Sequence, residues 1–363
     1  MHPSTLTIST PGRICLFGEH QDYLHLPVIA AAISLRISIH GSVRADDRMV
    51  IQLPDIAKEI SFSVSDDLKY EEERDYFRSG LNVLRRHGHR FSRGFDCVVH
   101  GNIPINAGTS SSSALTVSWI HFLSHVSDYP VRLSDEDIGK LAYEAEVLEF
   151  SEPGGMMDQY TTALGGLIFL ESHPQIKIAP LTAPVGAFVL GNSHEQKDTK
   201  NILGSVKEEV STAAQAVRKL DPDFSFHGTP VQALREVEGR MEKRQFQILE
   251  GTLLNRDITL RAKGLLREKR PDHRMIGTLL NDHQTILRDV LHISTPKVDA
   301  MIDAALRAGA LGAKINGSGG GGCMFAYAPE NTEEVAAAVR TIDEALVVRI
   351  DRGTHREQRK RTE

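Results

Sequence analysis

A turn-rich loop that leads into a buried helix is predicted by the stretch Asn102-Ile103-Pro104-Ile105-Asn106-Ala107-Gly108-Thr109-Ser110-Ser111-Ser112-Ser113-Ala114-Leu115. It joins a strand-like run at residues 95–100 to a dense apolar run at residues 114–123. The first N–H groups of a helix lack partners within the helix, and the helix dipole places partial positive charge there. The loop is therefore a candidate site for phosphate groups. A serine-rich turn that only caps the helix is the alternative.

The composition is that of a globular protein large enough for two packed domains, with 363 residues of which 40% are hydrophobic and 25% charged. The net charge of −6 argues against general binding to nucleic acid or anionic membranes, so any phosphate site has to be local. Cys15, Cys97 and Cys323 have no disulfide or zinc spacing. There is no signal-peptide pattern and no apolar run long enough to span a bilayer, so we expect a cytoplasmic protein.

Residues before the loop favour a sheet. Residues 6–9 and 13–17 have the pattern of two short strands separated by Pro11 and Gly12, and residues 33–39 alternate apolar and polar side chains. Between these strands lies the polar segment Gly18-Glu19-His20-Gln21-Asp22-Tyr23. Such a segment would suit hydrogen bonding to a polyol, although a solvated loop is the simpler explanation for it alone. Residues 71–86 predict an amphipathic helix.

Carboxylates follow the loop on two helix candidates. Ser134 and the acidic residues after it predict a helix start. The apolar stripe of this helix consists of Ile138, Leu141, Ala145 and Leu148. Glu144, Glu146 and Glu149 are the carboxylates of this helix, and plain surface charge is an alternative for each of them. Helical periodicity places Glu149 nearer to the apolar stripe than Glu146. Asp158 lies among methionines after a Pro-Gly-Gly turn, so it is either the cap of a short helix over residues 159–164 or a buried functional group.

The pattern changes near Pro184, where we place a domain boundary. Helices are predicted at residues 197–220, 231–238, 275–292 and 332–342, and strands at residues 186–191, 312–316, 323–328 and 345–350. Because strands and helices do not alternate strictly, the chain is predicted to be α+β and not a doubly wound sheet. The charged run at residues 356–363 is expected to fray.

A second glycine-rich turn, Asn316-Gly317-Ser318-Gly319-Gly320-Gly321-Gly322, lies between two of these predicted strands. A strand and not a helix follows it, which excludes a dinucleotide-binding fingerprint. Its glycines permit a close approach of the backbone to another surface or to a ligand.

Three segments in this order resemble the motifs of the GHMP kinases, the superfamily of galactokinase, homoserine kinase, mevalonate kinase and phosphomevalonate kinase. Residues 11–23 resemble the galactokinase signature, Gly108 to Leu115 the phosphate loop, and Lys314 to Cys323 the third, glycine-rich motif. The resemblance implies a two-domain α+β GHMP kinase fold with mixed sheets. Residues 1–184 would form the N-terminal phosphate-loop domain, residues 185–352 a ferredoxin-like C-terminal domain with extra helices, and residues 353–363 a charged tail.

The resemblance also implies an ATP-dependent small-molecule kinase, most similar to sugar 1-kinases of the galactokinase type. Asp158 would be the general base or the orienting partner of the acceptor hydroxyl, with Arg13 beside it. Ser112 and Glu146 would hold the Mg²⁺ that accompanies ATP, with Glu149 as the alternative. The sugar would be bound by Glu19, His20, Gln21 and Asp22. ATP would be bound by Asn106, Ala107, Gly108, Thr109, Ser110, Ser111, Ser112 and Ser113.

The identity of the acceptor stays open. The third motif is closer to the mevalonate kinase form, and residues 192–199 lack the sugar-binding tyrosine of galactokinases. A mevalonate-type kinase and a catalytically silent sugar and ATP sensor are therefore alternatives, although the presence of Arg13, Ser112, Glu146 and Asp158 argues against the sensor. The expected partners are a small-molecule sugar and ATP, not nucleic acid or a membrane, in a monomer or a homodimer.

Overall fold

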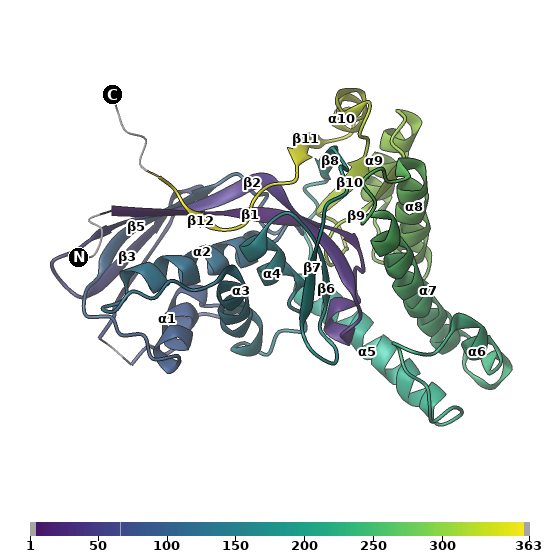
Figure 1. Cartoon of the computed structure of the whole chain (residues 1–363), viewed down its shortest axis with the longest axis horizontal. Helices are drawn as coiled ribbons and strands as arrows, with labels where there is room; N and C mark the ends of the chain where they lie inside the picture. The colour runs from purple at the N-terminus through teal and green to yellow at the C-terminus, as the bar shows by residue number, and fades with distance from the viewer. Residues whose placement is uncertain (1–4, 66, 359–363) are drawn as a thin grey trace.

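Two sheets form the framework of the chain in the computed structural model, which describes residues 5–65 and 67–358 (Figure 1). The larger sheet has eight strands in the order β12-β1-β2-β5-β3-β4, and β6 and β7 extend it from β2. Its β3–β5 pair is parallel and its other pairs are antiparallel. The strands are β1 (Thr5–Phe17), β2 (Val28–Val43), β3 (Arg48–Leu53), β4 (Lys58–Ser63), β5 (Phe95–Gly101), β6 (Leu167–Glu171), β7 (Lys177–Leu181) and β12 (His355–Arg356).

Strand β1 is continuous, so the prediction of two strands separated by Pro11 and Gly12 is wrong. The register with β2 shifts between Pro11 and Arg13, and such an irregularity accommodates a residue that has no N–H for the ladder. A Cβ on Gly12 would lie 2.8 Å from the Thr109 carbonyl oxygen, so only glycine lets β1 pass this close to the loop. The N–H of Arg13 donates to the same carbonyl at 3.1 Å. The strand thereby positions Arg13 against the phosphate loop.

Four helices cover one face of this sheet: α1 (Tyr76–Arg86), α2 (Ser111–Val126), α3 (Asp135–Tyr143) and α4 (Met157–Leu164) (Figure 1). Helix α1 begins later than predicted because Asp75 caps it, accepting from the N–H of Arg78. The predicted cap of α3 is confirmed, since Ser134 accepts from the N–H of Asp137. Helix α2 is buried at the centre, where Trp119 stacks on Phe122 with ring centroids 5.6 Å apart.

A π-helical turn over Glu144–Leu148 follows α3. The N–H of Glu149 bonds to the Glu144 carbonyl, five residues back, so each side chain beyond this point is rotated from its α-helical position. The predicted apolar stripe consequently breaks at Leu148, whose side chain is 56% exposed. Glu149 pairs with Arg86 at the surface, whereas Glu146 is buried at 7% exposure. The periodicity argument for Glu149 is therefore wrong.

The second sheet has four antiparallel strands in the order β11-β8-β10-β9. Its strands are β8 (Ala187–Asn192), β9 (Gly312–Ile315), β10 (Cys323–Tyr327) and β11 (Glu344–Arg349). Its helices are α5 (Thr199–Arg218), α6 (Val231–Arg235), α7 (Lys243–Leu265), α8 (His273–Asp289), α9 (Pro296–Arg307) and α10 (Thr332–Arg340). Short 3₁₀ turns lie at Asp22–Leu24, Pro54–Ile56 and Glu238–Arg240. The boundary near Pro184 stays a prediction, because one apolar cluster includes residues of both sheets.

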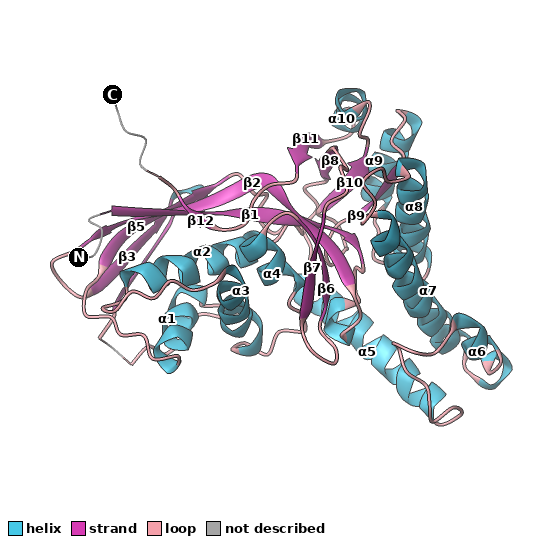
Figure 2. Ribbon diagram, viewed as in Figure 1, coloured by secondary structure: helices cyan, strands magenta, loops and turns pink. Residues whose placement is uncertain are grey.

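Helices α7 and α9 have no counterpart among the predicted elements. Helix α7 runs alongside α8 (Figure 2) and buries residues on several sides, including the consecutive positions Gly251, Thr252 and Leu253. It therefore has no single apolar stripe for periodicity to detect. None of the helices in the described ranges is both long and apolar enough to cross a membrane.

The chain returns to the first sheet after β11. Strand β12 pairs with β1, with Arg356 opposite Ile8. Arg36 holds the preceding segment, donating to the Asp351 carboxylate at 2.7 Å and to the Gly353 carbonyl at 3.0 Å. The expectation of a frayed run from residue 356 is wrong for residues 356 and 357, and its last five residues, 359–363, lie outside the described residues.

The glycine-rich turn between β9 and β10 packs against the phosphate loop. Asn316 donates to the Gly108 carbonyl at 2.8 Å, and its side-chain oxygen accepts from the N–H of Cys15 at 2.8 Å. The N–H of Cys323 donates to the Ala107 carbonyl at 2.8 Å. A Cβ on Gly317 would lie 2.9 Å from the Gly108 carbonyl oxygen. The third motif thus holds the loop from the side of the second sheet.

Substituting Gly317 tests this contact. Gly317 and Gly166 have φ angles of +83° and +70°, but a Cβ on Gly166 would meet no atom within 4 Å. We expect Gly166→Ala to lower the free energy of unfolding by about 1 kcal/mol through backbone strain alone. Gly317→Ala should cost at least about 1 kcal/mol more, because its Cβ also overlaps the loop. Urea unfolding measures both, and equal losses would contradict the close packing.

Candidate active site

One pocket opens where the phosphate loop, the end of β1, α4 and the segment before α5 meet. Among the predicted site residues, it is lined by Arg13, Glu19, His20, Asp22, Asn106, Gly108, Ser110, Ser111, Ser112, Ser113, Glu146 and Asp158. Ala107 and Thr109 do not line it, and their carbonyls instead accept from Cys323 and Arg13. Gly317 and Ser318 of the third motif also line the pocket, so the structure brings residues of all three motifs to one place.

The phosphate loop presents the start of a helix to this pocket. Gly108 and Ser110 have φ angles of +89° and +60°, which turn the chain sharply before α2 begins at Ser111. No side chain caps α2, and the Ser110 hydroxyl donates to Asp158 at 2.7 Å instead. The alternative of a simple capping turn is therefore wrong. A helix N-terminus without a side-chain cap in a polar pocket is suited to bind an anion.

Asp158 lies in the first turn of α4 but does not cap it. Arg13 donates to both carboxylate oxygens of Asp158, from Nε at 2.8 Å and from Nη2 at 2.7 Å. Its Nη1 donates to the Gly108 carbonyl. Burial disfavours the charge of Arg13, but the adjacent Asp158 outweighs that effect and raises the pKa of Arg13. The pair forms a fixed, partly buried group beside the phosphate loop.

Three of the four predicted sugar-binding residues have their side-chain polar atoms occupied by the protein. Glu19 accepts from Lys314 Nζ at 2.5 Å and from the N–H of Gly317. Nε2 of His20 lies 2.9 Å from the Ser318 carbonyl, so it carries the proton, and Nδ1 accepts from the Tyr23 hydroxyl. Burial lowers the pKa of His20, consistent with this neutral ring.

Gln21 does not line the pocket, so the structure does not bring it together with the other predicted sugar-binding residues. Its amide donates to the Thr252 carbonyl on α7 at 2.9 Å. The segment as a whole is no solvated loop, because Glu19, His20, Gln21 and Asp22 are each at most 8% exposed. The signature thus supports the junction of the two sheets as well as the pocket.

Asp22 is the exception among these residues. Oδ2 accepts from the N–H of Met157 at 2.7 Å and so caps α4, whereas Oδ1 is buried and has no hydrogen-bond partner among the described residues. Burial raises the pKa of Asp22 to about 6. A Cβ on Gly155 would lie 2.1 Å from Asp22 Cγ, so the glycine makes room for this carboxylate. Asp22 therefore offers an unused acceptor to the pocket.

Glu146 lies beside the first turn of α2. The Ser113 hydroxyl donates to its Oε1 at 3.1 Å, and the Gln159 amide donates to its Oε2 at 2.7 Å. Burial raises the pKa of Glu146, and hydrogen bonds from Gln159, Ser112 and Ser113 partly oppose that effect. A carboxylate with hydroxyl groups beside it is the hard oxygen set that suits Mg²⁺. No cluster of three or more His, Cys, Asp or Glu suited to a metal occurs in the described ranges, so nucleotide phosphates would have to complete the shell.

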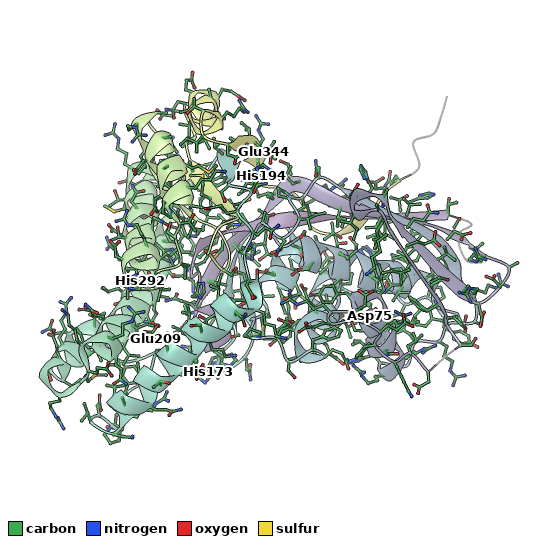
Figure 3. The ribbon with its side chains drawn as sticks, turned by 180° about the vertical axis from the view of Figure 1, so that it is seen from behind. Asp75, His173, His194, Glu209, His292 and Glu344 are labelled. Atoms are coloured by element: carbon green, nitrogen blue, oxygen red, sulfur yellow. The ribbon has the colours of Figure 1, made fainter. Side chains whose placement is uncertain are left out.

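Lys197 is a pocket residue that the sequence reasoning missed. A Cβ on Gly108 would lie 2.8 Å from its Nζ, and within residues 5–65 and 67–358 it has no hydrogen-bond or ion-pair partner. Burial, followed by the charge of Arg13, lowers the pKa of Lys197 to about 8. Its segment is anchored by His194, which lies beside Glu344 (Figure 3) with Nε2 3.4 Å from the carboxylate. Its one sequence signal is a lysine soon after a buried strand.

Comparisons with known families match most of the elements around the pocket. The description "GHMP kinases N terminal domain" matches residues 75–166, and "GHMP kinases C terminal" matches residues 262–345. The description "Galactokinase galactose-binding signature" matches residues 2–43. The mevalonate kinase of Thermococcus sibiricus is 30% identical over 342 residues, which is 92% of each chain. The galactokinase of Actinobacillus succinogenes is 28% identical over 360 residues, 93% of this chain and 88% of its own.

Solved structures have the same fold. Lactococcus lactis galactokinase complexed with galactose superposes with a TM-score of 0.85 at 20% identity, covering 97% of this chain and 95% of its own. Methanococcus jannaschii mevalonate kinase gives a TM-score of 0.72 at 20% identity, covering 97% of this chain and all of its own. The predicted two-domain α+β fold is thereby confirmed. With its ordered motifs, their meeting in one pocket and these full-length matches, the chain belongs to the GHMP kinase family.

Proposed function

We propose that the protein transfers the γ-phosphoryl group of ATP to the anomeric hydroxyl of a monosaccharide. The observation that carries this proposal is the juxtaposition of Asp158, fixed by Arg13 beside the phosphate loop, with the unused acceptor of Asp22 in the same pocket. The galactose-binding signature and the superposition on galactokinase support a sugar as acceptor.

Asp158 would receive the proton of the acceptor hydroxyl or orient that hydroxyl for attack. Its two oxygens are held by Arg13 and Ser110, so the carboxylate cannot rotate away from the phosphate loop. A base of this kind contributes about 10²–10⁴ in rate, and positioning and charge stabilisation supply most of the remainder of phosphoryl transfer.

The phosphates of ATP would lie at the start of α2, where unpaired N–H groups and the helix dipole favour negative charge. Lys197 and Arg13 flank Gly108 and would offset the charge of the transferring group. Ser112 and Glu146 would hold the Mg²⁺ bound with ATP, which would neutralise part of the phosphate charge.

The acceptor side of the pocket favours hydroxyl groups. A buried oxygen without a hydrogen bond costs about 1–3 kcal/mol, and a sugar hydroxyl donated to Asp22 Oδ1 would remove that cost. Mevalonate carries its own carboxylate, which Asp22 would repel when ionised. Mevalonate phosphorylation is nevertheless the second candidate, because mevalonate kinases are among the most similar relatives.

A panel of acceptors tests the reaction. We expect Mg·ATP-dependent ADP release with at least one monosaccharide, and a product phosphorylated at the anomeric oxygen, but no release with mevalonate. The Asp158→Asn variant should bind ATP normally yet lose at least about 10²-fold in turnover, which separates the enzyme from contaminating kinases. Turnover of mevalonate alone would support the second candidate, and sugar-dependent ATP binding without any product would support a sensor.

The carboxylate of Asp22 should control the decrease of kcat/KM for the sugar at low pH. Below pH 6 its carboxylate takes up a proton and loses acceptor capacity, so kcat/KM for the sugar should fall through a pKa near 6. Asp22→Asn should raise the KM for the sugar about 10-fold and abolish this decrease, while the KM for ATP changes little. If kcat/KM for the sugar still falls at low pH in Asp22→Asn, another group is responsible for that pH dependence.

The ammonium group of Lys197 should control the decrease of kcat/KM for ATP at high pH. Its ammonium is lost above pH 8, so kcat/KM for ATP should fall as the pH rises through that value. Lys197→Met should lower kcat/KM for ATP about 10²-fold at pH 7, and Lys197→Arg should retain charge and move the decrease to higher pH. Identical profiles for Lys197→Met and the unmodified protein would refute this role.

A further inference from the structure

Gln159 links the two halves of the pocket. It follows Asp158 in the first turn of α4, is 2% exposed and lines the pocket. Its side chain donates to Glu146 Oε2 at 2.7 Å. The orientation of the amide follows from the chemistry, because an ionised carboxylate only accepts hydrogen bonds and so must face the NH₂ group. The helix that carries Asp158 therefore also contacts the candidate metal ligand.

Glu146 is held at both oxygens by this arrangement. Gln159 binds Oε2, and the Ser113 hydroxyl binds Oε1 at 3.1 Å. Gln159 Nε2 also lies 3.4 Å from the Ser113 oxygen, which makes the three side chains one small network. The two oxygens of a carboxylate have four lone pairs, so hydrogen bonds from Gln159, Ser112 and Ser113 leave at least one on Glu146 for a cation. The network fixes the direction in which these lone pairs point.

The other end of the Gln159 amide is unsatisfied. Oε1 is buried and has no hydrogen-bond partner among residues 5–65 and 67–358. Leaving such an oxygen without a donor costs about 1–3 kcal/mol. The phosphates of ATP are acceptors and cannot supply the missing donor. Mg²⁺ keeps several water molecules when it binds through one carboxylate and phosphates, and those waters are donors.

We propose that Gln159 is a positioning residue of the metal site: Nε2 orients Glu146, and Oε1 accepts a hydrogen bond from a hydration water of Mg²⁺. This rests on the proposed function, because it takes Glu146 as the ligand of the Mg²⁺ bound with ATP. Groups that hold a metal ligand in place often matter almost as much as the ligand, since losing one typically weakens metal binding about 10–100-fold.

Two substitutions remove the proposed interactions in different ways. Gln159→Leu keeps a similar volume and deletes both hydrogen-bonding groups. Gln159→Glu keeps the shape but places a second carboxylate against Glu146. We would measure Mn²⁺ binding by electron paramagnetic resonance in the presence of a non-hydrolysable ATP analogue, with Mn²⁺ as the probe for Mg²⁺. Both variants should weaken Mn²⁺ binding about 10–100-fold.

Readouts other than Mn²⁺ affinity separate this role from a structural one. Affinity for the analogue in EDTA and the KM for the sugar at saturating Mg²⁺ should stay unchanged in Gln159→Leu, and high Mg²⁺ should restore part of its kcat. The matched control is Gln284→Leu, which removes a buried amide bonded to Ser294 and Ile315, outside the pocket. It should lower the free energy of unfolding but leave Mn²⁺ affinity as it is.

The Glu146→Gln variant separates a wrong role for Gln159 from a wrong assignment of Glu146 to the metal. If Glu146→Gln weakens Mn²⁺ binding and neither Gln159 variant does, the role of Gln159 is refuted and the metal site stands. If none of the three variants changes Mn²⁺ affinity, the assignment of Glu146 to the metal is refuted as well. If Gln159→Leu raises only the KM for the sugar, Oε1 serves the acceptor and the proposal is overturned.

Discussion

The Arg13 guanidinium is the interaction on which the arrangement of the pocket depends. It joins three elements that are far apart in sequence: strand β1, which carries it, helix α4 through Asp158, and the phosphate loop through the Gly108 carbonyl. The planar fork of arginine matches a carboxylate in two parallel hydrogen bonds, a geometry that lysine cannot reproduce. Removing one partner of this partly buried pair would leave the other charge without compensation, which would weaken the contact among the three elements.

A second buried charge pair joins the two sheets. Lys314 on β9 is fully buried and donates to Glu19, to the Cys15 carbonyl and to the Ile315 carbonyl, so all three of its protons are used. The polar signature after β1 is therefore partly a structural joint: its glutamate and glutamine connect the first sheet to β9 and α7, and its aspartate caps α4. This segment therefore resembles a ligand-binding motif, although most of its side-chain hydrogen bonds are made to the protein itself.

Local patterns in the sequence predicted the loop, the helix after it and most strands, because turns, caps and periodicity are short-range signals. The roles of Arg13 and Asp158 came from the resemblance to the family. The errors have long-range causes. The π turn over Glu144–Leu148 rotates the side chains that follow it around the helix axis, and no residue type in the sequence predicts such a turn. Lys197 meets Gly108, and Gln21 meets Thr252, only after the two sheets pack together. The continuity of β1 could not be predicted either, because it depends on the contact of Gly12 with the Thr109 carbonyl.

The return of the chain to β1 has a consequence for biosynthesis. Strand β12 pairs with the edge strand β1 of the first sheet, and Arg36 on β2 forms hydrogen bonds with Asp351 and Gly353 just before β12. In a growing chain, β1 therefore stays unpaired at this edge until residues 355 and 356 have been made and have left the ribosome. A chain that ended before β12 would leave the edge of β1 exposed, where it could pair with another chain.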